Sequence, residues 1–417
     1  MPAMTDPAGR GAAAVMLVCD YSLRYLGGAQ TAFVRQARSL ADQGWTVVVV
    51  APDADVLAGT ANVIPVSPHV RWTLPGLDLP ILGRRDGLAA TLGELIDRHG
   101  VAAMVVHSEF ALAAAVLAVG ARRAVPVLHT VHTFFWRAPV LLSPLAPVVR
   151  WFHRRLTGLP SAPRYTGSTP IDNALRGMTL RVALRADVVL SPSAHQAQAL
   201  RDAGVAQARA FSNVAEPMQL TDPPAAGPLT LLWAARFAPE KRVDVALDAI
   251  RIVGERLGPG RVHLHVAGGT RKPQPDVTFH GAVSADRVAA LIADSHAVLI
   301  TSLGFDNQPM IALEAFTRGR PVLVSDPALA TEFGAAALGT VTPDAAGLAE
   351  VLIAAIADDA TLRAAGAGAV AYAQARQSAE HAAALKRAIT DAAARASARP
   401  KLPSHSSRGF TPIPPTP

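Results

Sequence analysis

Short runs of apolar and β-branched residues alternate along the chain with segments of helical period. Residues 15–19 (VMLVC) and 45–51 (WTVVVVA) have the pattern of buried parallel strands. Between them, apolar residues recur on one helical face from Phe33 to Leu40. A strand, a helix and a second strand within about 35 residues form a βαβ unit. The alternation continues to residue 211, which predicts an α/β domain built on a parallel sheet.

A second alternation of the same kind begins at residue 229. The stretch before it, residues 217–228, is rich in proline and has no periodicity, as is typical of a linker. We therefore predict two Rossmann-like, doubly wound domains that face a cleft, over residues 14–216 and 229–390. The Ala-rich helices after residue 344 either stay with the second domain or return to the first.

The composition suits two buried cores, because half of the 417 residues are apolar and 17% are charged. The two ends differ: residues 1–13 lack the apolar run of a signal peptide, and residues 399–417 hold six prolines and three serines. We expect both ends to be disordered. No stretch reaches the roughly 18–20 apolar residues that span a bilayer, and the single Cys19 excludes an intramolecular disulfide. These features predict a cytoplasmic protein.

The positive charge of the chain is concentrated in one segment. The net charge is +7, and residues 136–185 alone carry eight arginines against one acid, Asp172. The remainder of the chain is therefore neutral, which argues against a general surface for nucleic acid.

This basic and apolar insert, residues 136–185, has two interpretations. Its first part interleaves tryptophan, leucine and valine with Arg150, Arg154 and Arg155, which suits a helix at an anionic membrane interface. The protein would then be peripheral on the inner face of the cell membrane. Prolines interrupt the same stretch, so it equally suits a lid over the cleft whose arginines face solvent or an anionic acceptor.

Two glycines, Gly27 and Gly28, separate the first strand from its helix. Glycine lets a ligand approach the backbone closely, and the helix N-terminus offers free N–H groups to an anion. A tight turn between strand and helix explains the same residues equally well.

Two cations follow the first strand of the second domain. Arg236 lies at its carboxyl end, and Lys241 lies close to the start of the next helix. Arginine can bind two oxygens of a diphosphate at once, and lysine supplies a compact charge. The alternative is a solvated run of charges that includes Glu240.

Two acids flank the start of a later helix in the same domain. Asp306 lies in the loop after a strand, and Glu314 lies about 7–8 Å along the helix that begins near Pro309. Carboxylates accept hydrogen bonds from sugar hydroxyls, and the free amides between the two acids suit phosphates. Alternatively, Asp306 caps the turn and Glu314 pairs with Arg318.

These motifs, in this order over residues 14–390, resemble the retaining glycosyltransferases of family 4, which have the GT-B fold. The similar stretches are the opening strand with its double-glycine loop, LHTVHTFFW, ADVVLSPSAHQAQALRDAG and FSNVAEP at the end of the first domain, WAARFAPEKR, and GFDNQPMIALEAFTRGRPVLVSD. The last stretch looks like the acid-x7-acid motif of the family and is the most specific of them. The resemblance implies a nucleotide-sugar donor and needs no cofactor and no metal.

The resemblance also implies roles for residues of the second domain. Arg236 and Lys241 would bind the donor diphosphate, and Glu314 would hold the ribose hydroxyls. Asp306 would contact the transferred sugar, together with the backbone of the residues that follow it: Asn307, Gln308, Pro309 and Met310. Gly268 and His280 lie where the family frames the nucleotide base.

In the first domain, the resemblance gives the donor contacts to Gly27, Gly28 and His132. The imidazole of His132 would contact the donor sugar and the positive charge that develops on it. Two departures stand out. Asp306 is one methylene shorter than the glutamate usual in the family, and Ala29 follows Gly28 where the family often has a glutamate.

The predicted function is transfer of a hexosyl group from GDP-mannose or a UDP-hexose to a glycan or lipid-linked acceptor, in cell-envelope glycan synthesis. Two rivals stay open. An isomerase or epimerase of the same fold would need acid–base carboxylates in the first domain, which His107 and Glu109 offer only weakly. The other rival is a non-catalytic scaffold that binds a nucleotide sugar.

Histidines also recur in pairs that could suggest a metal site. His129 and His132 lie near His107 in the predicted sheet, and His263 and His265 share a strand. A zinc site would want a further acid or cysteine, and the sequence marks none beside either group. We therefore predict no metal.

Overall fold

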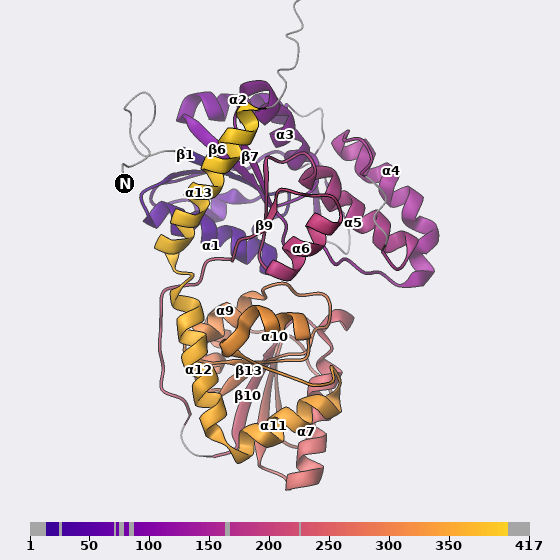
Figure 1. Cartoon of the computed structure of the whole chain (residues 1–417), viewed down its shortest axis with the longest axis vertical. Coiled ribbons are helices and arrows are strands. Elements are labelled where there is room, and N and C mark those ends of the chain that lie inside the picture. Colours follow the sequence, from indigo (N-terminus) through magenta and orange to yellow (C-terminus); the bar gives the residue numbers. More distant parts are fainter. Residues whose placement is uncertain are drawn as a thin grey trace, which may run out of the picture.

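Two α/β domains lie one above the other in the computed structural model (Figure 1). The structure describes residues 14–24, 27–70, 72–74, 79–82, 87–162, 167–224 and 227–398. The two ends expected to be disordered, and residues 163–166 of the basic and apolar insert, lie outside the described residues.

Parallel strands form the sheet of the first domain, in the order β3-β2-β1-β6-β7-β8-β9. They are β1 (Ala14–Val18), β2 (Thr46–Val50), β3 (Val63–Val66), β6 (Val101–Val106), β7 (Val127–Thr130), β8 (Val188–Ser191) and β9 (Ala208–Ala210). Every residue of β1 is buried, because both faces of the sheet are covered. Val15 and Leu17 face one core, and Met16 and Val18 face the other.

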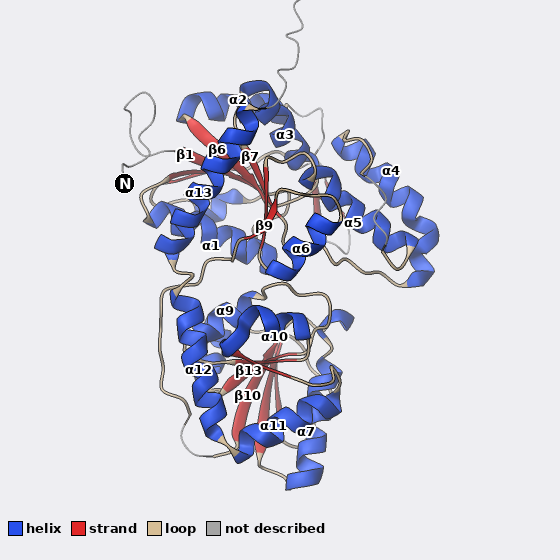
Figure 2. Ribbon diagram, in the orientation of Figure 1, coloured by secondary structure: helices blue, strands red, loops and turns tan. Residues whose placement is uncertain are grey.

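Helices cover both faces of this sheet (Figure 2). The core on one side contains α1 (Gly28–Asp42), and the core on the other side contains α2 (Leu88–His99) and α3 (Ala111–Arg123). The helix α6 (Ala194–Asp202) packs beside β8 and β9. The domain also contains a short hairpin of β4 (Trp72–Leu74) and β5 (Leu79–Ile81) and the 3-10 turn η1 (Ala54–Leu57).

The sheet of the second domain is also parallel, in the order β12-β11-β10-β13-β14-β15. Its strands are β10 (Leu229–Ala234), β11 (Val262–Ala267), β12 (Val277–Gly281), β13 (Ala297–Ile300), β14 (Val322–Val324) and β15 (Ala337–Gly339). One face carries α7 (Val243–Leu257) and α11 (Ala345–Ala357). The other face carries α8 (Ala285–Ala293), α9 (Met310–Phe316), α10 (Pro327–Phe333) and α12 (Asp359–Gln374).

The strand order reverses at one point in each sheet. In the first sheet the connections diverge between β1 and β6, and in the second between β10 and β13. Ligands of open α/β sheets bind at such points, at the carboxyl ends of the strands. The predicted α/β class with two doubly wound domains is confirmed, although the short strands β3 and β15 were not among the predicted elements.

The chain crosses between the domains twice. After the first domain it passes through the segment around residues 212–228, and after α12 it crosses back to α13 (Ser378–Ser397). Leu385 and Ile389 of α13 share one core with Phe33 and Leu40 of α1. Of the two alternatives for the Ala-rich helices, α11 and α12 therefore stay with the second domain and α13 joins the first.

The basic and apolar insert divides into two parts. The helix α5 (Pro170–Ala183) buries Leu180, Val182 and Ala183 in the cores of the first domain. The 3-10 segment η2 (Val140–Leu145) and α4 (Ala146–Thr157) lie at the edge of the domain (Figure 1). Only the first half of the insert is thus an addition to the domain. Within the described ranges, no helix is long and apolar enough to cross a membrane.

Candidate functional site

An ion pair connects two loops at the strand-order reversal of the second sheet. Lys241 ends the turn η3 (Pro239–Lys241) after β10, and Asp306 lies in the loop after β13. Lys241 Nζ lies 2.6 Å from Asp306 Oδ1 and 2.8 Å from Oδ2. The two side chains are only 19% and 13% exposed, so solvent screens their attraction less than it screens a surface pair. A lysine ammonium has three N–H groups, so one remains for a further acceptor.

The backbone of Lys241 is held from the core of the domain. The hydroxyl of Thr301 donates to the Lys241 carbonyl at 2.7 Å, and it accepts from the indole N–H of buried Trp233 at 2.9 Å. The ring of Phe305 lies 5.2 Å from the ammonium of Lys241 and gives it a cation–π contact. The position of this charge is therefore fixed by residues of β10, β13 and the acid-bearing loop.

Arg236, the other predicted diphosphate ligand, is not brought to this ion pair. Its side chain is 82% exposed, and its ion-pair partner is Glu240, at 3.8 Å. This is the solvated pair that the sequence left as the alternative for Arg236. The structure thus holds one of the two predicted cations in place and leaves the other exposed to solvent.

Glu314 ends the acid-x7-acid motif, at the start of the second turn of α9, and contacts the first domain. Its Oε1 accepts from Arg35 Nη2, on α1, at 2.5 Å. Arg35 also lies 2.8 Å from Glu216 in the connecting segment. Arg318 donates to the backbone carbonyl of Glu314 at 3.1 Å and to Gln219 Oε1 at 2.8 Å, and not to the Glu314 carboxylate, so the alternative of an i,i+4 side-chain pair is wrong. Burial raises the pKa of Glu314, and the charge of Arg35 works against that rise.

The two amide side chains after Asp306 also reach the first domain. Asn307 Nδ2 donates to the backbone carbonyl of His132 at 2.9 Å and to Gln196 Oε1 at 2.6 Å. Gln308 Nε2 donates to Ser212 Oγ at 2.7 Å, and Gln308 Oε1 accepts from the Asn213 amide at 2.7 Å. The acid-bearing loop is therefore attached to the first domain beside His132. The sequence had assigned these two residues only a backbone role.

The predicted glycines differ in the space around them. A Cβ atom on Gly28 would meet no described atom within 4 Å, so the start of α1 faces open space, whereas a Cβ on Gly27 would lie 2.9 Å from Gln30. Gly268 has a positive φ of 115°, and a Cβ there would lie 1.9 Å from the Ala235 carbonyl. Only glycine fits at Gly268, because it allows β11 to end against the loop that carries Arg236.

His280, Pro309 and Met310 are the remaining residues predicted for the donor site. His280 Nε2 lies 3.1 Å from His265 Nδ1, and burial lowers the pKa of both rings. Pro309 is the N-cap of α9, and Met310 begins the helix and is buried. None of these three contacts the ion pair of Lys241 and Asp306 in a described hydrogen bond.

His132 follows β7 and is half-buried. Its Nε2 lies 2.9 Å from Nδ1 of His107, which follows the neighbouring strand β6. Within the described part of the chain, this is the one hydrogen bond of the His132 ring. Burial lowers the pKa of His132 to about 4 and lowers that of His107 well below its ordinary value. Both imidazoles are therefore neutral at physiological pH.

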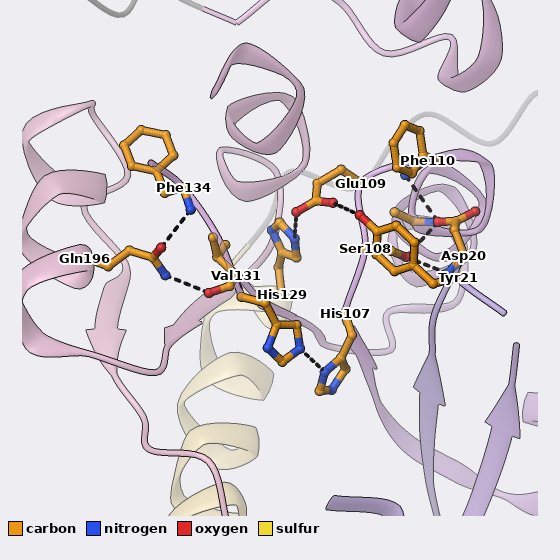
Figure 3. Close-up of polar contacts among 12 residues, drawn as sticks. Asp20, Tyr21, His107, Ser108, Glu109, Phe110, His129, Val131, Phe134 and Gln196 are labelled. Carbon is orange, nitrogen blue, oxygen red and sulfur yellow. Dashed lines mark hydrogen bonds and ion pairs between the residues drawn. The ribbon is translucent and has the colours of Figure 1, made fainter. Parts of the chain in front are cut away.

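A second group of buried polar side chains lies beside these rings (Figure 3). Asp20 accepts from Ser108 Oγ at 2.7 Å and from the Leu112 amide, in the first turn of α3, at 2.8 Å. Glu109 accepts from the Tyr21 hydroxyl at 3.3 Å and lies 3.9 Å from His129 Nε2.

Burial raises the pKa of Glu109 to about 8, and the charge of Asp20 adds to the rise. The Glu109 carboxyl, only 11% exposed, is thus engaged inside the domain. This arrangement gives an isomerase no free acid–base carboxylate at that position. Among the described residues, no three histidine, cysteine or acidic side chains are grouped so that they could hold a metal ion.

The two halves of the chain match models of glycosyltransferase families. Residues 26–211 match Glycosyltransferase Family 4, and residues 228–358 match Glycosyl transferases group 1. The chain is built from two glycosyltransferase domains. The first match contains His132, and the second contains Lys241 and Asp306, so the contact of Asn307 with His132 joins the two domains. The sequence matches none of the curated proteins with which it was compared.

Solved structures of glycosyltransferases share the fold of both domains together. Sucrose-phosphate synthase from Thermosynechococcus elongatus has a TM-score of 0.64 at 16% identity, over 91% of this chain and 98% of that chain. Anabaena Alr3699/HepE in complex with UDP and glucose has a TM-score of 0.61 at 15% identity, over 90% and 99%. The catalytic domain of starch synthase IV from Arabidopsis thaliana, bound to ADP and acarbose, has a TM-score of 0.61 at 12% identity, over 92% and 100%. At these identities the likeness shows the GT-B fold alone.

Several residues at the cleft were not found from the sequence. Arg35, Gln36 and Gln196 occupy ordinary polar positions of helices, and each contacts a residue more than 60 positions away: Glu314, His107 and Asn307, respectively. The stretch FSNVAEP, which resembles the end of the first domain in the family, was the one local signal for Ser212 and Asn213.

Proposed function

We propose that this glycosyltransferase chain transfers a hexosyl group, with retention, from a nucleotide diphosphate sugar to a glycan or lipid-linked acceptor. One observation carries the proposal: the loop that pairs Asp306 with Lys241 donates, through Asn307, to the backbone of His132. The loop of a largely buried cation and its carboxylate is therefore held against the backbone of a residue with a neutral imidazole, and both lie at the carboxyl ends of parallel strands. During transfer the leaving diphosphate gains negative charge and the sugar gains positive charge, so the two groups need neighbours that differ in charge.

Each group has a task in this proposal. Lys241 uses its free N–H on the diphosphate, and exposed Arg236 turns inward when the donor binds. Asp306 accepts from hydroxyls of the transferred sugar, and Glu314 accepts from the ribose with the oxygen that Arg35 does not use. His132 faces the sugar. The leaving phosphate takes the proton of the acceptor hydroxyl, so the reaction needs no protein base and no metal ion.

The donor is GDP-mannose or a UDP-hexose. A structure of Anabaena Alr3699/HepE holds UDP-glucose, which supports a sugar of this class. In this chain Gly268 and His280 would frame the base. The absence of a Cβ on Gly28 leaves the space that phosphates or acceptor need.

The test is a panel of nucleotide sugars incubated with the purified chain. We expect one donor to raise the thermal midpoint and to be hydrolysed slowly to free sugar and nucleoside diphosphate, with or without a chelator. Conversion to an epimeric nucleotide sugar would favour an isomerase instead. Stabilisation without any turnover, in the presence of candidate acceptors, would favour a binding scaffold.

We also propose that the acceptor is reached at an anionic membrane surface on the cytoplasmic face, as part of cell-envelope glycan synthesis. Large apolar side chains of η2 and α4 are exposed: Leu141 by 89%, Val140 by 69% and Trp151 by 64%. Arg150, Arg154 and Arg155 are exposed on the same helix. Apolar side chains beside arginines suit the headgroup region of anionic lipids.

The contacts of α4 with the domain explain why its arginines face solvent. Buried His153 of α4 contacts the Glu109 carbonyl at 2.7 Å and Arg181 at 3.0 Å, so one face of α4 is fixed to the domain. Neighbouring arginines add to burial in lowering the pKa of Arg181, which indicates an uncompensated positive potential at this edge.

Sedimentation with vesicles tests this part. The chain should bind vesicles that contain phosphatidylglycerol and should not bind pure phosphatidylcholine. Replacing Arg150, Arg154 and Arg155 together with Ser should remove the binding. The matched control replaces Arg251, Arg256 and Arg363, which are exposed on the second domain, and should bind as the parent does. Unchanged binding of the first variant would overturn the membrane assignment and leave the donor assignment standing.

A further inference from the structure

A row of polar side chains lies behind His132 in the first domain. His132 Nε2 lies 2.9 Å from His107 Nδ1, and His107 Nε2 lies 2.8 Å from Gln36 Oε1. Gln36 Nε2 in turn lies 2.8 Å from Nε2 of His381, on α13. The row thus connects the cleft with the last helix of the chain.

Each ring in this row carries a single N–H. Burial lowers the pKa of His381 to about 4, as it does for His132, and the pKa of His107 is lowered further by the neighbouring histidines. A neutral imidazole has one donor nitrogen and one acceptor nitrogen. If one bond in the row has a fixed direction, every other bond follows from it.

The amide of Gln36 supplies that fixed direction. Its Oε1 lies 2.8 Å from His107 Nε2 and can only accept, and its Nε2 lies 2.8 Å from His381 Nε2 and can only donate. His381 Nε2 must therefore accept, which leaves the single N–H of the His381 ring on Nδ1.

The remaining two tautomers follow. His107 must donate from Nε2 to the oxygen of Gln36, so its Nδ1 has no proton and accepts. The partner of that Nδ1 is His132 Nε2, which must therefore carry the proton of its ring. The Nδ1 of His132 is left with a lone pair.

We infer that Gln36, His107 and His381 are positioning residues that hold His132 as the Nε2–H tautomer and so present an Nδ1 lone pair to the donor sugar. The role for the sugar rests on the proposed function, whereas the tautomer does not. A lone pair accepts from a sugar hydroxyl and lies favourably beside the positive charge that develops at the anomeric carbon. The opposite tautomer would direct an N–H at that charge and would oppose the reaction.

The surroundings of the row also include a contact to the acid-bearing loop, which carries Asp306. Ser212 lines one small cavity together with Gln36, His107 and His381, and its hydroxyl accepts from Gln308 at 2.7 Å. The loop that carries Asp306 therefore contacts a residue that borders the row.

NMR of chain labelled with ¹⁵N only at histidine tests the tautomer directly, because protonated and unprotonated ring nitrogens give well-separated ¹⁵N signals. We expect His132 and His107 to be protonated at Nε2 and His381 at Nδ1. An Nδ1–H tautomer for His132 in the unliganded chain would overturn the inference. This measurement needs no turnover, so its result is independent of whether the chain is an active transferase.

Three variants separate positioning from mere packing. His381→Phe removes the acceptor that holds the Gln36 amide in this orientation, without touching the His132–His107 pair, and we expect His132 to become a mixture of both tautomers. His107→Leu should do the same, whereas His107→Gln, whose amide can donate to Gln36 and accept from His132, should restore a single tautomer. His263→Phe, on β11 of the other domain, is the control and should leave the His132 signals unchanged.

Activity gives a second readout once a donor is known. The kcat of donor hydrolysis should fall about tenfold in His381→Phe, the effect of one hydrogen bond, with the KM for the donor nearly unchanged. An unfolded variant is recognised by its circular dichroism. A folded His381→Phe variant that keeps a single Nε2–H tautomer at His132 would show that the row is only structural.

Discussion

The two walls of the cleft differ in charge although both are built from the same kind of sheet. In the second domain, Lys241 and Asp306 form an ion pair, and Glu314 pairs with Arg35 of the first. In the first domain, His107 and His132 follow the adjacent strands β6 and β7, and burial keeps both rings neutral. The same kind of sheet edge therefore carries an ion pair in one domain and a pair of neutral imidazoles in the other.

The difference follows from how each edge is solvated. A buried ion is stable only with a partner, and the loops after β10 and β13 carry opposite charges close together. His107 and His132 follow adjacent strands with no charged partner for either ring, so each loses its proton and shares a hydrogen bond instead. A site that binds an anion and also faces a developing positive charge can combine a buried ion pair with neutral imidazoles.

Removing the charge of the second wall should have the largest effect. Lys241→Ala takes away the buried ammonium, and we expect kcat/KM for the donor to fall by about 10²–10³, as for loss of one preorganised electrostatic contact. Lys272→Ala removes an exposed lysine of the same domain and should leave the rate unchanged. Near-normal turnover by a folded Lys241→Ala protein would contradict the assignment of the diphosphate to this residue.

The contact between the walls should contribute an intermediate amount. The Arg35–Glu314 pair is mostly buried, with side chains 14% and 21% exposed, so we expect a coupling free energy of about 1–2 kcal/mol. A double-mutant cycle of Arg35→Ala and Glu314→Gln, followed by urea unfolding, measures it. Additive effects would mean that the pair does not hold the domains together.

The smallest expected effect concerns a neutral histidine in the first wall. Burial lowers the pKa of His129 from 6.5 to about 3, and neither ring nitrogen has a hydrogen-bond partner among the described residues. Between these two pH values the unfolded chain binds a proton that the folded chain does not, so the free energy of unfolding falls as the pH falls. His129→Phe should therefore lose stability less steeply from pH 6.5 to about 4.5.

Thermal midpoints measured at several pH values test this expectation, with His263→Phe as the comparison. Parallel midpoint curves for the parent and His129→Phe would show that His129 takes up a proton in the folded state without cost.

The sequence alone is enough to predict that Lys241 and Asp306 lie close together, but it is not enough to predict the hydrogen-bonded row behind His132. Lys241 and Asp306 each follow a strand, and parallel strands end at one edge, so their proximity could be anticipated from local patterns. The row of Gln36, His107 and His381 could not, because Gln36 and His381 are 345 residues apart and meet only when α13 returns to the first domain. No local feature of an Ala-rich helix indicates which domain it will cover.

The insert shows a similar limit. Its arginines and apolar residues were visible in the sequence. The burial of α5 was not, because it depends on Leu180 and Ala183 packing in one core with residues of β8 and β9. Likewise, Arg236 and Lys241 look alike in the sequence, as two cations after one strand. Only the positions of Thr301 and Asp306 in the structure show that Lys241 is held in place while Arg236 is exposed.

The return of α13 has a consequence for biosynthesis. Leu385, Ala388 and Ile389 complete a core that begins with Val15 and Leu17, so the domain that leaves the ribosome first is the last to be finished. Until the final helix emerges, the apolar side of α1 and β1 has no cover, and a chaperone or the nascent second domain must shield it. A ribosome that stalls before residue 378 would release a chain whose front half cannot close.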